Sequence, residues 1–283
     1  MDPASRALRA GARGHHPSPR PARGLLPRAP LRLDARVARW HRGGHAPARA
    51  EQRARGDPGE RLAAVKRAAF FDLDKTLVNV NTGTLYVRWR VREGHMGVRE
   101  LMRASFWSLQ YTLGVLDAER MGAEAVRTLT GVPEQQFRDE CASWVRSEVL
   151  RHVAQKARDE LRRRRDEGYV CAILTSSSPY VAEPVAEHVG IEHVLCSRIQ
   201  VREGSFTGAL ESPLCYGAGK VDKALQWAER HGVDLASSAF YTDSVSDLPM
   251  LERVGEPRVI NPDPRLSRLA RRRGWAVETW RPS

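Results

Sequence analysis

Side chains suited to acid–base or metal chemistry stand in short clusters that are far apart in the sequence. The clusters are two pairs of aspartates, a run of hydroxyl residues and one lysine: Asp72 and Asp74, Asp243 and Asp247, Thr175–Ser178, and Lys220. Each cluster alone has an ordinary explanation, as a solvated loop, a helix cap or an exposed lysine. An EF-hand loop is excluded at Asp72, because the later Asp/Asn-Gly positions are missing. A shared chemistry requires a fold that brings the clusters together.

A short apolar run precedes three of the clusters. Ala68–Asp74 ends in the first aspartate pair, Tyr169–Leu174 precedes the hydroxyl run, and Ala239–Thr242 leads into Asp243. Such runs are typical of buried strands in a parallel sheet. The remaining predicted elements of this part are a fourth strand at Val259-Ile260, a helix at Lys220–His231, and a hairpin of Val194–Val201 with Ser205–Leu210.

Strands that alternate with helices predict an α/β fold, with a Rossmann-like parallel sheet and helices on both of its faces. Residues 84–165 have helical periodicity and are too many for a simple crossover, so we expect a helical cap inserted after the first strand. The predicted core comprises residues 66–78 and 168–283, and the predicted cap comprises residues 79–167. Ligands of such sheets bind beyond the carboxyl ends of the strands, where all four clusters should converge.

In this order, the clusters resemble the motifs of the haloacid dehalogenase-like (HAD) phosphatase superfamily, over about residues 66–280. Asp72-Leu-Asp74-Lys-Thr76 matches its DxDxT motif, and Thr242-Asp243-Ser244-Val-Ser-Asp247 is close to its GDSxxD motif. Thr175 and Lys220 take the places of the two motifs between them. The helical insertion is similar to the C1 cap of subfamily IB, the phosphoserine-phosphatase-like branch.

The resemblance implies a phosphomonoester hydrolase that uses Mg²⁺, forms an aspartyl-phosphate and acts on a small phosphorylated metabolite. It implies Asp72 as the nucleophile and Asp74 as the general acid and base. The implied Mg²⁺ ligands are the carboxylates of Asp72 and Asp243 and the backbone carbonyl of Asp74. A divalent cation is needed because a carboxylate nucleophile and a phosphate dianion repel each other.

Further residues are implied to bind phosphate or to support the site. Thr175, Ser176 and Lys220 would hold the phosphoryl oxygens, and Asp247 and Ser244 would support them. Lys223 competes with Lys220 for the lysine position. We favour Lys220, because it follows Gly219 and begins the helix.

The sequence departs from the family pattern at three places. Thr242 stands where the family often has glycine, which narrows the site but removes no ligand. Ser176-Ser177 replaces the Gly-Gly that is usual in phosphoserine phosphatases. Asn81 lies near the position of a glutamate that helps those enzymes to bind the substrate ammonium, so Asn81 is a candidate specificity residue and the phosphoserine interpretation is weakened. Phosphoserine phosphatase proper, a phosphotransferase and a non-catalytic binding module tethered by a basic arm stay open as alternatives.

The charge of the chain is concentrated at its beginning. The 283 residues carry a formal net charge of +12, and residues 1–60 hold 13 arginines, no lysine and five acidic residues. This proline-rich stretch has no sustained apolar period, so a disordered basic arm is predicted. The arm would suit nucleic acid or an anionic membrane, or would be a targeting segment. We favour a further interpretation, an upstream stretch translated from a wrongly placed start codon.

Two exclusions concern location and redox chemistry. No run of about 18 apolar residues occurs, so no transmembrane helix is expected. The four cysteines have no CxxC spacing, which excludes a zinc ribbon and favours a reducing compartment. A cytoplasmic enzyme is therefore predicted.

Overall fold

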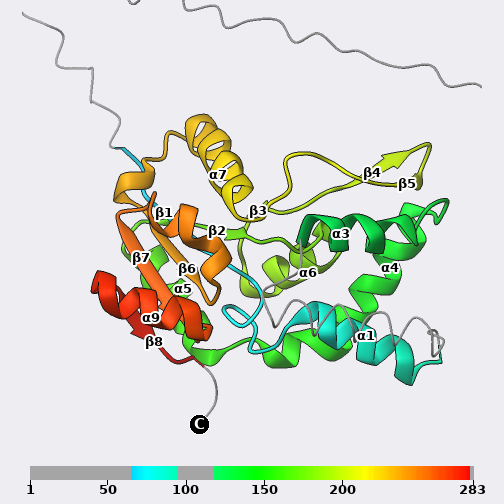
Figure 1. The fold of residues 1–283 in the computed structure, drawn as a ribbon, viewed down its shortest axis with the longest axis horizontal. Coiled ribbons are helices and arrows are strands. Elements are labelled where there is room, and N and C mark those ends of the chain that lie inside the picture. Colours follow the sequence, from blue (N-terminus) through cyan, green and yellow to red (C-terminus); the bar gives the residue numbers. More distant parts are fainter. Residues whose placement is uncertain (1–64, 95–117, 281–283) are drawn as a thin grey trace, which may run out of the picture. The chain divides into compact units, whose positions relative to one another are not determined.

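The fold is built on one parallel sheet, seen in a computed structural model that describes residues 65–94 and 118–280 (Figure 1). Six strands lie in the order β3-β2-β1-β6-β7-β8, and every neighbouring pair is parallel. The strands are β1 Ala68–Phe71, β2 Val170–Leu174, β3 His193–Leu195, β6 Ala239–Thr242, β7 Glu256–Ile260 and β8 Ala276–Glu278. The predicted Rossmann-like α/β fold is confirmed. The predicted basic arm, residues 1–60, lies outside the described residues.

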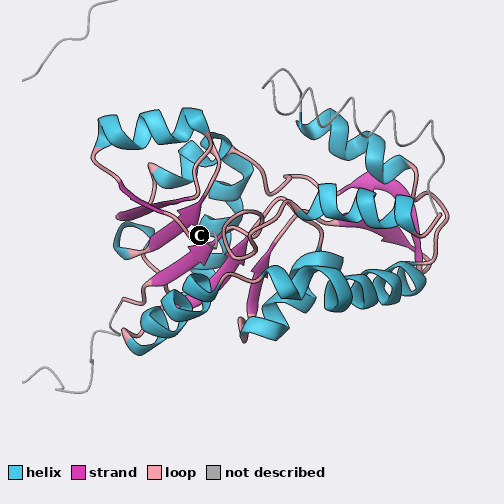
Figure 2. Cartoon of the chain, turned by 90° about the horizontal axis from the view of Figure 1, so that it is seen from below, coloured by secondary structure: helices cyan, strands magenta, loops and turns pink. Residues whose placement is uncertain are grey.

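Helices cover both faces of the sheet (Figure 2). Alternate residues of a strand point to opposite faces, and β1 shows this directly. Ala69 and Phe71 pack into one apolar cluster, whereas Ala68 and Phe70 pack into the other. The first face carries α5 Gln155–Asp166 and α6 Pro179–Val189, and the second carries α7 Ala218–His231, α8 Leu248–Leu251 and α9 Pro264–Arg273. Short 3-10 turns at Leu235–Ser237 and Val245–Asp247 flank β6.

A helical insertion follows β1. Its described helices are α1 Thr82–Arg92, α3 Ala118–Arg127 and α4 Glu134–Trp144, which continues as a π-helical turn Val145–Val149 and a 3-10 turn Leu150–His152. The outgoing and returning chains pair, since the Asn79 amide donates to the His152 carbonyl at 2.8 Å. Helix α5 then packs on the sheet through Ala157 and Leu161. The predicted domain division at residues 79 and 167 remains a prediction.

A two-stranded hairpin lies outside the main sheet and supports the insertion. It consists of β4 Ile199–Arg202 and β5 Ser205–Leu210. The predicted strand Val194–Val201 was wrong in extent, because its first part joins the main sheet as β3 and only its last part pairs with β5. No turn residue interrupts this run, so the sequence gives no sign of the change of partner. The Gly131 amide donates to the Phe206 carbonyl at 2.9 Å, which ties the insertion to the hairpin.

All four cysteines are buried free thiols. In the part of the chain that the structure describes, no helix is both long enough and apolar enough to cross a membrane.

Candidate active site

The predicted site residues come from the carboxyl ends of three neighbouring strands. Asp72 follows β1, Thr175 follows β2 and Asp243 follows β6, and these strands lie side by side in the order β2-β1-β6. Because all three strands are parallel, their carboxyl ends share one edge of the sheet. Thr175, Asp72 and Asp243 are all buried. The strands therefore bring side chains from three distant parts of the sequence to one edge.

Lys220 joins two of the predicted carboxylates. Its Nζ donates to Asp72 Oδ1 at 3.1 Å and to Asp247 Oδ2 at 2.7 Å, and the Lys220 side chain is 2% exposed. These two contacts belong to Lys220 and not to Lys223. Lys220 lies in the first turn of α7, where the chain comes very close to a neighbouring loop: a Cβ at Gly219 would lie 1.9 Å from the Leu214 carbonyl oxygen. Only glycine fits this approach, so Gly219 lets the helix begin where Lys220 can reach the site.

Asp74 is held by the beginning of α1. Its carboxylate accepts the Thr82 amide at 2.9 Å and the Asn81 Nδ2 group at 3.3 Å. Asn81 is also the N-cap of α1, and its Oδ1 accepts both the amide and the hydroxyl of Thr84. Both ends of the Asn81 amide are therefore in use within the chain. A role of Asn81 in substrate specificity remains a prediction.

Asp243 lies in a turn whose contacts with other parts of the chain were not predicted from the sequence. The Asp263 amide donates to the Asp243 carbonyl at 2.8 Å, and Asp263 Oδ2 accepts the Val245 amide at 2.7 Å. Lys75 Nζ lies 3.7 Å from Asp243 Oδ2. Lys75 has a positive φ of 51°, unusual for a residue with a side chain, and its carbonyl accepts the Asn261 side chain at 2.7 Å.

The predicted phosphate-binding residues occupy the loop between β2 and α6. The Thr175 amide donates to the Leu195 carbonyl at 2.9 Å, and the Thr175 hydroxyl accepts the Ser177 amide at 3.2 Å. Ser176 between them is exposed. Helix α6 begins directly after Ser178, so its N-terminal amides face the same loop, an arrangement that favours anions. Ser244 acts locally, as its hydroxyl accepts the Ser246 amide at 3.3 Å.

The carboxylates of the site carry more negative charge than the lysines balance. Burial raises the pKa of Asp72 to about 6, with Lys220 opposing the rise and Asp247 adding to it. Burial and the nearby charge of Asp72 raise the pKa of Asp243 to about 8. Burial also raises the pKa of Asp74. Burial alone would lower the pKa of Lys220, but the charges of Asp247 and Asp72 outweigh it, so Lys220 stays protonated.

This donor set fits a divalent cation with hard oxygen ligands. Mg²⁺ is usually bound by one or two carboxylates together with waters and substrate phosphate. The buried carboxylates of Asp72 and Asp243, whose pKa values are raised chiefly by burial and further by neighbouring aspartates, meet that requirement. Among residues 65–94 and 118–280, no three His, Cys, Asp or Glu side chains group closely enough to hold a metal by themselves. A two-carboxylate site completed by the Asp74 carbonyl needs no third side chain.

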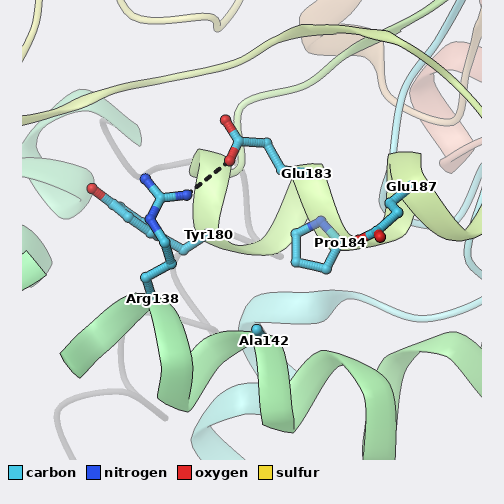
Figure 3. Close-up of a pocket in the computed structure, with 6 residues that line it drawn as sticks. All are labelled: Arg138, Ala142, Tyr180, Glu183, Pro184 and Glu187. Carbon is cyan, nitrogen blue, oxygen red and sulfur yellow. Dashed lines mark hydrogen bonds and ion pairs between the residues drawn. The ribbon is translucent and has the colours of Figure 1, made fainter. Parts of the chain in front are cut away.

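A separate hollow of about 350 Å³ lies between α4 and α6 (Figure 3). Its lining includes Arg138, Tyr180 and Glu183, and none of the predicted site residues. Arg138 pairs with Glu183 at 2.9 Å and with Glu134 at 2.9 Å, and Glu134 also accepts the Tyr180 hydroxyl at 3.0 Å. The polar groups of this hollow thus pair with one another, and they join the helical insertion to the core.

Comparisons with known proteins place this chain among hydrolases and phosphatases. Residues 69–252 match the profile of the family described as haloacid dehalogenase-like hydrolase. The chain is 31% identical over 216 residues to the inhibition of morphological differentiation protein of Streptomyces azureus, covering 75% of this chain and 78% of that protein. It is 29% identical over 223 residues to a probable phosphatase of Mycobacterium tuberculosis, covering 78% and 77%. A histidinol-phosphatase of Neisseria meningitidis is 25% identical over 219 residues, covering 75% and 98%.

Solved structures show the same fold. A protein of unknown function from Bordetella pertussis Tohama I has a TM-score of 0.69 at 30% identity, covering 75% of this chain and 98% of that one. A phospho-aspartyl intermediate analogue of phosphoserine phosphatase has a TM-score of 0.54 at 21% identity, covering 72% and 90%. The second likeness is one of fold.

Proposed function

This chain belongs to the haloacid dehalogenase-like hydrolase family and is a phosphatase, and from that premise we propose that it hydrolyses a small phosphomonoester with the help of Mg²⁺ and an aspartyl-phosphate intermediate. One observation carries the proposal. Lys220 contacts Asp72 and Asp247 at the carboxyl edge of the sheet, beside the buried carboxylate of Asp243. An attacking carboxylate, a fixed cation and oxygen ligands are the groups that phosphoryl transfer needs.

In the first half-reaction, an Asp72 oxygen attacks phosphorus and the bond to the leaving alkoxide breaks. Asp74 donates its proton to that alkoxide, and burial, which raises the Asp74 pKa, favours the protonated acid before the attack. Lys220 holds its charge against the phosphoryl oxygens as negative charge develops on them. Asp72, Asp243 and the Asp74 carbonyl would hold Mg²⁺, which supplies charge neutralisation when bound.

In the second half-reaction, water displaces Asp72 from phosphorus. Asp74, now ionised, accepts a proton from that water, so one residue serves as acid and then as base. Thr175, with the amide of Ser176, holds a phosphoryl oxygen through both steps, aided by the N-terminus of α6. The products are inorganic phosphate and the free alcohol, and Asp72 is restored.

The contacts of Asn81 bear on the identity of the substrate. Asn81 is neutral and its amide already bonds Asp74 and Thr84, which disfavours an ammonium-bearing substrate at that position. We therefore favour a small phosphomonoester other than phosphoserine. Histidinol phosphate, which the similarity to a histidinol-phosphatase brings into the panel, also carries an ammonium group, so it tests this preference together with phosphoserine.

The test is the release of inorganic phosphate from a panel of esters, in Mg²⁺ and in EDTA. We expect turnover of at least one ester that EDTA abolishes and that Asp72→Asn lowers by about 10³-fold or more. The control is Asp159→Asn, the same change at an exposed carboxylate of α5 whose partners, Arg162 at 3.7 Å and Gln155 at 3.1 Å, lie on the same helix. Turnover that survives Asp72→Asn would contradict the proposed nucleophile. Phosphate transfer to an added alcohol would indicate a phosphotransferase instead.

A further inference from the structure

Thr242 is the last residue of β6 and is fully buried. Its hydroxyl donates to Asp247 Oδ2 at 2.6 Å, the same oxygen that accepts Lys220 Nζ at 2.7 Å. A continuous chain of contacts therefore runs from Thr242 through Asp247 and Lys220 to Asp72. Thr242 is the member of this chain at which the sequence departs from the GDSxxD motif.

The direction of the Thr242 hydrogen bond follows from its second contact. The Ser244 amide points at the Thr242 oxygen, at 3.2 Å, so this oxygen accepts there. A hydroxyl has one proton, and Asp247 is the acceptor that the structure offers for it. The Thr242 hydroxyl thus accepts a hydrogen bond from the turn after β6 and donates its own proton to the Asp247 carboxylate.

This hydrogen bond changes how Asp247 acts on Lys220. A carboxylate oxygen that accepts a buried hydroxyl has part of its negative charge compensated, and the carboxylate cannot rotate freely. Lys220 contacts both Asp247 and Asp72. A weaker attraction between Lys220 and Asp247 therefore leaves more of the Lys220 charge to act on Asp72 and on the phosphoryl group. Loss of the hydroxyl should therefore draw Lys220 toward Asp247 and away from the reacting atoms.

We propose that Thr242 is a positioning residue of the phosphatase reaction, whose hydroxyl holds Asp247 so that Lys220 faces Asp72. The inference rests on the proposed function. Glycine, which the family pattern often has at this place, offers no hydroxyl for this contact. Threonine at position 242 therefore adds a functional contact in this chain and is not merely a larger residue in the place of glycine.

The test compares two changes at Thr242. Thr242→Val keeps the shape and removes the hydroxyl, whereas Thr242→Ser keeps the hydroxyl. With the best ester of the panel, we expect Thr242→Val to lower kcat by about tenfold, the effect of losing roughly one buried hydrogen bond. KM should change by less than about threefold, because the loss falls mainly on the transition state. Thr242→Ser should keep kcat within about twofold of the original protein.

A matched control separates positioning from folding. Ser238 lies at the other end of the same strand, is also fully buried, accepts the Ala68 amide at 2.9 Å and donates to the Asp234 carbonyl at 2.6 Å. Ser238→Ala should lower the melting temperature and leave kcat unchanged. If Thr242→Val does not fold, Thr242→Cys replaces it, since a thiol is a weak donor.

Three results would overturn the inference: an unchanged kcat in Thr242→Val, an equal loss in Thr242→Ser, or an equal loss in Ser238→Ala. Asp72→Asn separates this failure from failure of the proposed function. If the original protein has no ester turnover, or if turnover survives Asp72→Asn, the proposed function fails and the inference falls with it. If Asp72→Asn is inactive and Thr242→Val is fully active, only the inference fails.

Discussion

Lys220 and Arg164 are two buried cations that lie at opposite ends of the same sheet, and their surroundings differ. The side chain of each is 2% exposed. Lys220 stands at the carboxyl ends of the strands, beside Asp72 and Asp247. Arg164, in α5, reaches the amino ends, where it contacts Glu256 at 2.6 Å and the Tyr241 hydroxyl at 2.7 Å.

The pKa shifts of the neighbouring carboxyls have opposite signs at the two ends. Hydrogen bonding from Arg164 lowers the pKa of Glu256 to about 2, so charge there is compensated. Burial raises the pKa of Asp72 to about 6 and of Asp243 to about 8, so these carboxyls lack full compensation of their charge when they ionise. A compensated cluster stabilises the fold, whereas buried carboxyls with raised pKa values are typical of functional sites, and this is the edge at which we propose that a cation and a substrate act. The contrast distinguishes a structural ion cluster from a functional one.

Replacement of each cation by methionine gives the largest expected effects. Lys220→Met should lower kcat/KM by about 10²–10³-fold or more, because the developing phosphoryl charge loses its fixed counter-charge. Arg164→Met should leave the kcat of the folded protein within about twofold. It should destabilise the protein by about 1.5–3 kcal/mol, because the hydrogen bonds of a buried guanidinium to Glu256 and Tyr241 are lost. Steady-state kinetics and urea unfolding measure the two quantities.

Equal losses of kcat in Lys220→Met and Arg164→Met would contradict the distinction between a functional and a structural cation. Stability measured at the assay temperature is the necessary control, since a partly unfolded Arg164→Met would imitate a catalytic defect. Addition of Mg²⁺ should not restore Lys220→Met, because a cation held by Asp72 and Asp243 would not replace the contacts that Lys220 makes with Asp72 and Asp247.

The pH dependence of stability should also have opposite signs at the two ends. The folded pKa of Asp243, about 8, lies above its ordinary value of 3.8, so the metal-free protein loses stability as pH rises between these values. Asp243→Asn should therefore stabilise the protein in EDTA by about 1–2 kcal/mol, and the gain should grow from pH 4 to pH 8. Mg²⁺ should abolish the gain.

Glu256 gives the matching measurement at the amino ends of the strands. Its folded pKa of about 2 lies below its ordinary value of 4.5, so its contribution is present above pH 4.5 and is lost as pH falls toward 2. Glu256→Gln should thus be destabilised at neutral pH and approach the original protein in acid. Melting temperatures of both variants across pH check the signs, and parallel curves would contradict the comparison.

The smallest effect on stability is expected for Arg163, the neighbour of Arg164. Arg163 pairs with Glu160 and Glu167, each at 2.5 Å, but its side chain is 47% exposed. Exposed ion pairs contribute little because water screens them. Arg163→Ala should cost less than about 1 kcal/mol in urea unfolding. A cost as large as that of Arg164→Met would mean that burial does not decide the value of these pairs.

Much of the fold could be predicted from local pattern. The buried strands that end at Asp72, Thr175 and Asp243 are short apolar runs, and the helix of Lys220 is amphipathic. Strand β8, Ala276–Glu278, was not predicted, because all three residues are exposed and carry no apolar alternation. The end of β3 was missed because a continuous run gave no boundary.

The sequence by itself determined which chemical groups are present and which strand or helix carries each, because hydrophobic periodicity and turn residues act over a few neighbours. Only the tertiary structure decided which groups meet. The Lys220–Asp72 contact joins residues 148 positions apart, and the Asn261 side chain reaches Lys75 across 186 positions. The role of Thr242 also needed the structure, since nothing local to Thr242 reveals that Asp247 shares one oxygen between its hydroxyl and Lys220. Such contacts depend on strand order and burial, which only the assembled sheet defines.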